Sequence, residues 1–216
     1  TSTLSGAISG GALTKSGAGA LTLSGTNTYT GGTTLTSGIL RAQGAASLNG
    51  TGAIALDGGE LQLASDTSAS FGNNVTVGGN AQITSDRLTA GAGQTQTLGT
   101  LSIGANTLSV ATTANVTSGT AGLTLGATTT GGATVNSNAG VLTTLGAVTG
   151  TGNSLTIGGA GDTTLSGGLN TGAAGTLIKN GAGMLTLTSA GSYTGSTAVN
   201  AGVVDVQNNT ALGTSA

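Results

Sequence analysis

The sequence predicts an all-β fold, and three observations favour a β-solenoid, in which the chain winds through stacked coils of short strands. The composition disfavours helices, because 43 of the 216 residues are Gly and each Gly inside a helix costs roughly 1 kcal/mol relative to Ala. Short pairs of apolar residues separated by one residue recur along the chain. Corresponding pairs return at intervals of roughly 20 to 26 residues, so we expect about 20 to 24 residues per coil and roughly ten coils.

Two local patterns place the strands and corners of this solenoid. Side chains alternate along a strand with a period of two, so each apolar pair is typical of a short strand with one buried face. Gly-rich pairs between the strands supply positive φ angles at little steric cost and mark corners. The apolar pairs are Leu21/Leu23, Ile54/Leu56, Leu61/Leu63, Val75/Val77, Leu101/Ile103, Leu108/Val110, Leu123/Leu125, Leu155/Ile157 and Leu185/Leu187, and the corners are Gly31-Gly32, Gly58-Gly59, Gly78-Gly79-Asn80, Gly131-Gly132 and Gly158-Gly159.

An up-and-down barrel or a sandwich is the competing β architecture, since it also has short strands separated by frequent turns. Sandwich strands usually run to about 5 or 6 residues, whereas the alternation here gives two inward residues per strand. Small residues flank nearly every apolar pair, which suits a narrow core in which each coil sits on the last. These features favour the solenoid.

A long internal repeat supports this organisation. The stretch from Leu13 to Leu48 returns from Leu177 to Leu212 without a gap, at an offset of 164 residues, and 15 of the 36 positions are identical. If coils average about 20 residues, the offset corresponds to about eight coils. With strands stacked about 4.8 Å apart, we expect Tyr29 and Tyr193 on the same side of the solenoid, roughly 38 Å apart, each ring covering a Gly-rich corner.

The whole chain, residues 1–216, is predicted to form a single solenoid segment with repeat copies at 13–48 and 177–212. The sequence shows neither a starting Met nor a signal-peptide pattern, and it opens inside a repeat. We therefore expect it to be part of a longer or processed protein.

Composition excludes several functional classes. The net charge is −2, and the four basic residues Lys15, Arg41, Arg87 and Lys179 form no stripe, so nucleic acid is not an expected partner. No apolar run of about 18 residues is present, so this segment is not expected to insert into a membrane. Because the chain has no His and no Cys, Ser-His-Asp and Cys-His catalysis and the usual zinc sites are excluded.

The acidic residues suggest no chemistry either. Asp57 and Glu60 flank a Gly-Gly corner, where they could form a glycosidase pair, but two solvated turn residues are the simpler interpretation. Gly158-Gly159-Ala160-Gly161-Asp162 resembles the start of a calcium-binding nonapeptide, yet Asp162 comes one residue early and no second copy follows. Asp86-Arg87 is interpreted as a surface ion pair or two solvated charges. We predict no catalytic, cofactor-binding or metal-binding residues, no cofactor and no enzymatic activity.

Both repeat copies carry Lys-x-Gly-x-Gly, Leu-Thr-Leu and Tyr-Thr-Gly in the same order, and the second copy closes on Ala211-Leu212-Gly213. This pattern resembles the passenger-associated repeat of bacterial autotransporters. The first copy departs from the pattern at Ser47-Leu48-Asn49. Over 36 residues twice, about a third of the chain, the resemblance implies a right-handed parallel β-helix passenger. It also implies export to the cell surface or extracellular space of a Gram-negative bacterium.

From these observations we expect a structural stalk or spacer segment of a surface-exposed or secreted, adhesin-like autotransporter passenger. The alternative is a subunit of an extracellular filament, in which the bare end coils of the same or a neighbouring chain stack end to end. A polysaccharide-binding or polysaccharide-cleaving β-helix is a third possibility, but Tyr29, Tyr193 and Phe71 offer little for sugar stacking. The sequence does not identify a host or cell-surface ligand.

Overall fold

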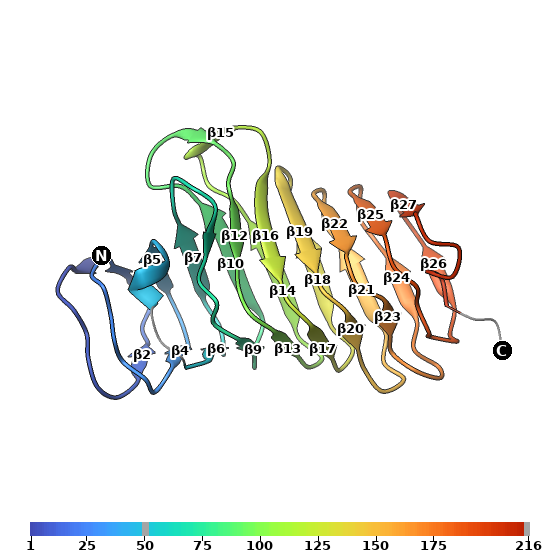
Figure 1. The fold of residues 1–216 in the computed structure, drawn as a ribbon, viewed down its shortest axis with the longest axis horizontal. Coiled ribbons are helices and arrows are strands. Elements are labelled where there is room, and N and C mark those ends of the chain that lie inside the picture. Colours follow the sequence, from blue (N-terminus) through green and yellow to red (C-terminus); the bar gives the residue numbers. More distant parts are fainter. Residues whose placement is uncertain (49–51, 214–216) are drawn as a thin grey trace.

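The structure, a computed structural model, describes residues 1–48 and 52–213. This part of the chain forms a parallel β-solenoid of about ten turns with about 21 residues per turn. The coils stack into an elongated body, with the two chain ends at its opposite ends (Figure 1). The predicted fold class and coil length are therefore confirmed. The strand pairs are parallel, whereas neighbouring strands of a sandwich are antiparallel, so the competing architecture is rejected.

Three long parallel sheets, here called faces A, B and C, run along the stack of described residues. Face A contains β1 (Ser2–Leu4), β3 (Ala20–Leu23), β5 (Ile39–Gln43), β7 (Glu60–Ala64), β10 (Ala81–Asp86), β14 (Thr107–Ala111), β18 (Thr134–Ser137), β21 (Leu155–Gly158), β24 (Leu177–Lys179) and β26 (Thr197–Val199). Face B contains β2 (Leu13–Lys15), β4 (Thr33–Leu35), β6 (Ile54–Leu56), β9 (Val75–Val77), β13 (Leu101–Ile103), β17 (Thr128–Thr130), β20 (Val148–Thr149) and β23 (Leu169–Asn170). Face C contains β8 (Ala69–Ser70), β12 (Thr95–Thr97), β16 (Ala121–Leu125), β19 (Val141–Leu145), β22 (Asp162–Leu165), β25 (Met184–Leu187) and β27 (Val203–Val206).

A complete coil visits face A, then face C, then face B, and returns to face A one coil further on, as β14, β16, β17 and β18 do. A 3-10 turn, η1 (Ala45–Leu48), takes the place of a face C strand in one early coil. No helix among the described residues is long and apolar enough to cross a membrane.

The core consists of aliphatic columns that run along the inside of the stack. Leu40, Leu61, Ile83 and Val110 are in register on neighbouring strands of face A, and each is 0% exposed. Because the register is kept from coil to coil, each inward side chain packs directly on its equivalent in the next coil. The period-two alternation therefore identified the core correctly.

The two repeat copies lie on different faces of the solenoid. From β3, which holds the Leu-Thr-Leu motif of the first copy, face A runs through β5, β7, β10, β14, β18 and β21 to β24, which is seven coil steps. The second Leu-Thr-Leu motif lies one face further on, in β25 of face C. The 164-residue offset therefore spans seven and one third coils, and the second copy is rotated by one face relative to the first.

This rotation makes one sequence-based expectation wrong. Tyr29 lies in the loop between β3 and β4, where a face C strand would stand, whereas Tyr193 lies between β25 and β26, where a face B strand would stand. The tyrosines are therefore on different sides of the solenoid. The expectation failed because it assumed coils of about 20 residues and a whole number of coils between the copies.

The two tyrosines nevertheless have the same local environment. Tyr29 is 1% and Tyr193 is 0% exposed, and burial raises the pKa of both phenols. The Tyr29 hydroxyl hydrogen-bonds the Thr33 hydroxyl at 2.7 Å, and the Tyr193 hydroxyl bonds that of Thr197 at 2.6 Å. Each ring fills the interior of a coil where a strand is replaced by a loop, so both act as packing residues.

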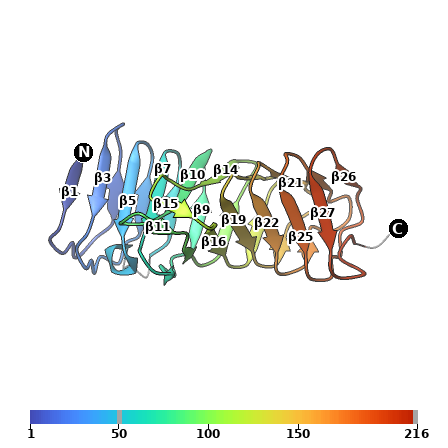
Figure 2. The ribbon, with the colours of Figure 1, turned by 90° about the horizontal axis from the view of Figure 1, so that it is seen from above.

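Two neighbouring coils bulge outward near the middle of the body. The bulge, here called the flap, comprises residues 87–94 and 112–120 and contains β11 (Gly91–Ala92) and β15 (Val116–Ser118), which pair in parallel with a register shift. It rises above the stack in Figure 1 and lies in front of the stack in Figure 2, which shows the body from above. The flap is therefore a local excursion from an otherwise regular rod.

A first prediction tests the inward–outward alternation. Leu125 on β16 is 1% exposed, whereas Thr124 points outward and is partly exposed. Leu125→Asp is expected to destabilise the protein by several kcal/mol, because it buries an unpaired carboxylate, and Thr124→Asp is expected to cost far less. Thermal unfolding of both variants checks this, and equal losses would contradict the assigned orientation.

A second prediction concerns Gln96, whose side chain points into the core between Ala69 and Leu123 of the adjacent coils. Gln96 is 0% exposed, and its Oε1 has no hydrogen-bond partner among the described residues. Gln96→Leu is expected to raise the free energy of unfolding by roughly 1 kcal/mol or more, because it removes a buried unpaired acceptor. Denaturant unfolding measures this, and the exposed Gln207→Leu is the matched control, for which little change is expected.

Candidate functional site

The carboxylates considered as a catalytic pair, Asp57 and Glu60, lie at the turn between β6 and β7. Asp57 is exposed. Glu60 Oε1 accepts hydrogen bonds from Thr84 Oγ1 at 2.6 Å and from Gln62 Nε2 at 2.9 Å. Glu60 therefore connects an outward side chain of its own coil with one of the next coil. These contacts give it a structural role on the surface of face A.

Asp162, considered in the sequence as part of a calcium motif, also connects two stacked coils. Its Oδ1 accepts a hydrogen bond from the backbone N–H of Met184 in the next coil at 2.8 Å. Within the described residues, no group of three or more His, Cys, Asp or Glu side chains is placed to hold a metal ion.

The predicted pairing of Asp86 with Arg87 is wrong. Asp86 is 2% exposed and pairs with Arg41, with 2.6 Å between Asp86 Oδ2 and Arg41 Nη1. Arg87 pairs instead with Asp66, with 3.4 Å between Nη2 and Oδ1. The correction has a topological cause: Asp86 ends β10 on the outward side of face A, and Arg41 reaches it from β5, two coils away.

Polar side chains form a connected network over β5, β7 and β10. Arg41 Nη1 also donates to Gln62 Oε1 at 2.9 Å, and Gln82 Nε2 donates to Thr84 Oγ1 at 3.1 Å. Arg41, Gln62 and Thr84 are in register on adjacent strands. The network therefore runs across the coils and ends beneath the flap at Asp86.

The flap is attached to this network. Thr113 Oγ1 donates to Asp86 Oδ1. Asn115 Nδ2 and Arg41 Nη2 donate to the carbonyl of Arg87 at 3.0 and 2.8 Å. These contacts bury the carboxylate of Asp86, and removing its partner from such a buried pair is strongly destabilising. The contacts therefore fix both arms of the flap to the body.

A second attachment point lies at Asp66. Its carboxylate accepts hydrogen bonds from the N–H groups of Leu88 and Thr89 at 3.0 and 2.9 Å and from Thr89 Oγ1 at 2.8 Å. The backbone hydrogen bond from Thr89 is the largest of the effects that lower the pKa of Asp66. Leu88 is 43% exposed, so polar contacts hold this arm of the flap.

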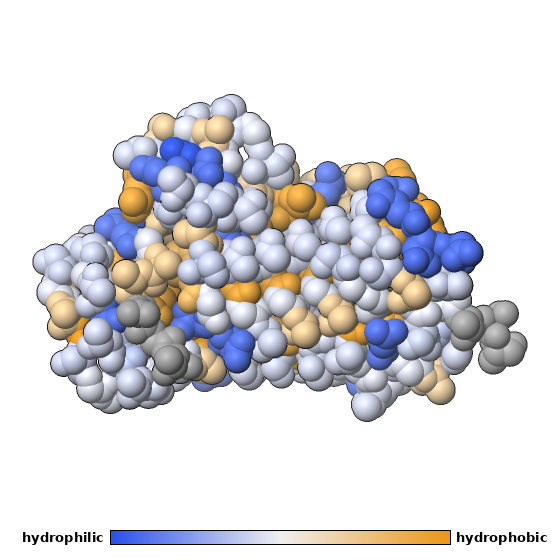
Figure 3. Space-filling view, in the orientation of Figure 1, coloured by the Kyte–Doolittle hydropathy of each residue, from blue (hydrophilic) through white to orange (hydrophobic). Residues whose placement is uncertain are grey.

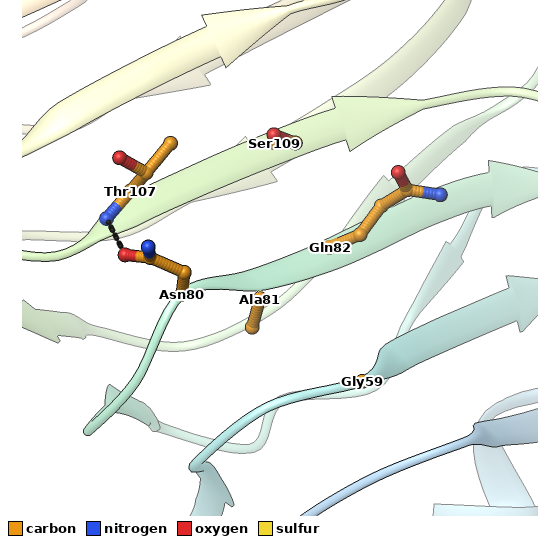
Figure 4. A pocket seen from close by; sticks show the side chains of 6 residues that line it. All are labelled: Gly59, Asn80, Ala81, Gln82, Thr107 and Ser109. Carbon is orange, nitrogen blue, oxygen red and sulfur yellow. Dashed lines mark hydrogen bonds between the residues drawn. The ribbon is translucent and has the colours of Figure 1, made fainter. Parts of the chain in front are cut away.

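A depression of about 360 Å³ lies beside the network on face A. It is lined by Gly59, Asn80, Ala81, Gln82, Thr107 and Ser109. Figure 4 shows Gln82 and Ser109 on neighbouring strands, with Asn80 Oδ1 accepting the N–H of Thr107 at 2.8 Å. Its lining offers amides and hydroxyls, which can hydrogen-bond neutral polar groups. It contains neither a nucleophile with a base nor a pair of carboxylates.

Sequence reasoning gave no role to the two lysines, although both stand at the same position of the repeat. Lys15 is 7% and Lys179 is 1% exposed, and each ammonium group lies among backbone carbonyls. Burial lowers the pKa of Lys179. The presence of the same charged residue in both copies was the sequence feature that could have indicated a role for these lysines.

Comparison with known families agrees with this internal repeat. The family model of the passenger-associated-transport-repeat matches residues 13–42 and 177–206. Neither the curated proteins nor the solved structures contain a match to the chain.

The matched segments begin at the two lysine strands and end within β5 and β27, so each covers strands on two faces together with its tyrosine loop. The chain thus carries two passenger-associated-transport repeats in a parallel β-solenoid, an organisation consistent with an autotransporter passenger built from β-helix repeats.

Proposed function

We propose that this segment is a structural stalk or spacer of a surface-exposed or secreted autotransporter passenger, and that it has no catalytic role. The observation that carries the proposal is face A, which extends without interruption from β1 to β26. Such a sheet couples each coil to both neighbours and gives a rod whose length grows with the number of coils. The repeat family supports a passenger-like structural role.

The flap is the element that such a rod would present in an adhesin-like function. It rises from the body of the protein, whose visible face is largely of intermediate hydropathy (Figure 3). Its arms are fixed by Asp86 and Asp66 and by the β11–β15 pair. A rigid projection loses little conformational entropy on binding a partner, which favours recognition.

The aromatic residues argue against a polysaccharide site. Tyr29, Tyr193 and Phe71 are 1%, 0% and 7% exposed, so their rings are not available for stacking on sugars. The alternative of a self-assembling filament is favoured by one observation: Val199, Val203 and Leu212 in the last coils are 52%, 57% and 45% exposed. Burial of these side chains by another coil would be favourable.

Electron microscopy of the purified chain separates the stalk from the filament. A stalk segment is expected to give isolated rods about 50 Å long, since roughly ten coils stack about 4.8 Å apart. Sedimentation should then show a monomer at all concentrations. Continuous fibres of uniform width would reject the stalk proposal in favour of end-to-end assembly. In that case the Val203→Lys variant should not form fibres.

A further prediction concerns the attachment of the flap. The folded-state pKa of Asp66 lies below its usual value of 3.8, so its carboxylate stabilises the flap above that pH and loses this effect as the pH falls through the folded-state pKa. Hydrogen-exchange protection of the Leu88 and Thr89 amides, corrected for intrinsic rates, is therefore expected to fall as the pH is lowered below 3.8.

Asp66→Asn is expected to lower the protection of these amides already at neutral pH, because the amide lacks the charge that strengthens the hydrogen bonds. Asp57→Asn, a change at an exposed turn away from the flap, is the matched control. Protection that stays constant with pH and in Asp66→Asn would show that other contacts hold the flap.

A further inference from the structure

The side chain of Lys15 ends in a cage of backbone carbonyls from two successive coils. Its Nζ donates to the carbonyl oxygens of Gly17 at 2.7 Å and Ser16 at 3.2 Å, in its own turn, and of Ser37 at 3.0 Å, in the turn of the next coil. The ammonium group is thus shared between two stacked turns.

Lys179 makes the same contacts in the second repeat. Its Nζ donates to Gly181 O at 2.8 Å, to Asn180 O at 2.9 Å and to Ala201 O of the next coil at 3.4 Å. The three carbonyls occupy the repeat positions of those around Lys15, although Lys15 ends a strand of face B and Lys179 a strand of face A. The cage therefore belongs to the repeat and not to a particular face.

The number of acceptors fits the charged form of the side chain. An ammonium group has three N–H donors and no acceptor, whereas a neutral amine has two, and each cage supplies three carbonyls. The ion pairs of the described residues involve Arg41 and Arg87 and not the lysines. The partial negative charges of peptide carbonyls are therefore the direct partners of both buried ammonium groups.

A glycine in the second turn completes each cage. Gly38 and Gly202 occupy equivalent repeat positions and have φ angles of 73° and 77°, a region that favours Gly. A Cβ added at these glycines would lie 2.6 Å from Lys15 Nζ and 2.9 Å from Lys179 Nζ. The glycine thus provides both the backbone conformation and the space for the ammonium group.

We propose that the lysine of each passenger-associated-transport repeat is a tethered cation that fastens the turn of one coil to the turn of the next. In this role Lys15 and Lys179 are positioning residues that bind turns of the backbone. These contacts require only two consecutive turns and their glycines. The repeat can therefore lie on faces B and A, as the first copy does, or on faces A and C, as the second copy does. The same carbonyl cage is a binding site for a small primary ammonium ion when the side chain is removed.

Chemical rescue tests the cation directly. Lys15→Ala and Lys179→Ala are each expected to lower the thermal midpoint by roughly 5 to 10 °C, because buried carbonyls lose a charged donor. Propylammonium chloride, which restores the missing atoms of the side chain, is expected to recover part of the loss in each variant. Sodium chloride and propanol at equal concentrations serve as controls and should not do so.

Two substitutions separate the charge from the bulk of the side chain. Lys15→Met keeps an apolar stem of similar length and is expected to be as unstable as Lys15→Ala or nearly so, with faster exchange of the Ile39 amide, which donates to Gly19 of the preceding turn. Thr14→Met, at the exposed neighbour on the same strand, is the control and should leave both readouts unchanged. Wild-type stability in Lys15→Met would overturn the proposal.

A measurement on the unsubstituted protein remains decisive even if the variants do not fold. The chain contains two lysines, so mass spectrometry can follow reductive dimethylation of each one. Both should resist the reagent in the native protein and react in urea. Reaction of the lysines in the native state at the rate seen in urea would overturn the proposal.

Discussion

The constraint on which this structure depends is that no coil can satisfy its backbone or bury its apolar side chains without the coils beside it. Strands of two to six residues with one to three inward side chains form the faces, and the N–H and C=O groups of these strands point along the axis to neighbouring coils. In-register stacking turns each apolar pair into part of a continuous column, as in Leu40, Leu61, Ile83 and Val110. The stability of such a solenoid is therefore a property of its interfaces between coils.

Where the chain leaves this regular pattern, polar groups replace the apolar columns. Arg41 and Asp86 connect coils beneath the flap, Asp66 binds backbone N–H groups of one flap arm, and the lysines bind carbonyls of the repeat turns. A narrow core leaves corners and bulges without enough apolar surface, and their backbone groups must still find partners when water is excluded. Most of the few charged side chains of this chain, among them Arg41, Asp86 and both lysines, accordingly connect neighbouring coils.

The sequence determined the class of the fold because that information is local. Alternation within each strand places Leu125 inward and Thr124 outward, the glycines mark turns, and the spacing of the strands gives the coil length. The repeated motif likewise showed where related local structures would recur, and both tyrosines do have the same hydrogen bond to a threonine four residues later. Residue types also excluded the chemistry that requires His or Cys.

The relative positions of residues several coils apart depend on the sum of many coil lengths, and only the tertiary structure decided them. A small excess per coil, accumulated over 164 residues, rotates the second repeat by one face and separates the tyrosines onto different sides. The partners of Asp86 and Glu60 were equally hidden, because Arg41 and Thr84 are 45 and 24 residues away and become neighbours through the register of stacked strands. The lysine cages are formed by backbone carbonyls, which every residue possesses, so no side-chain pattern could reveal them before the turns were stacked.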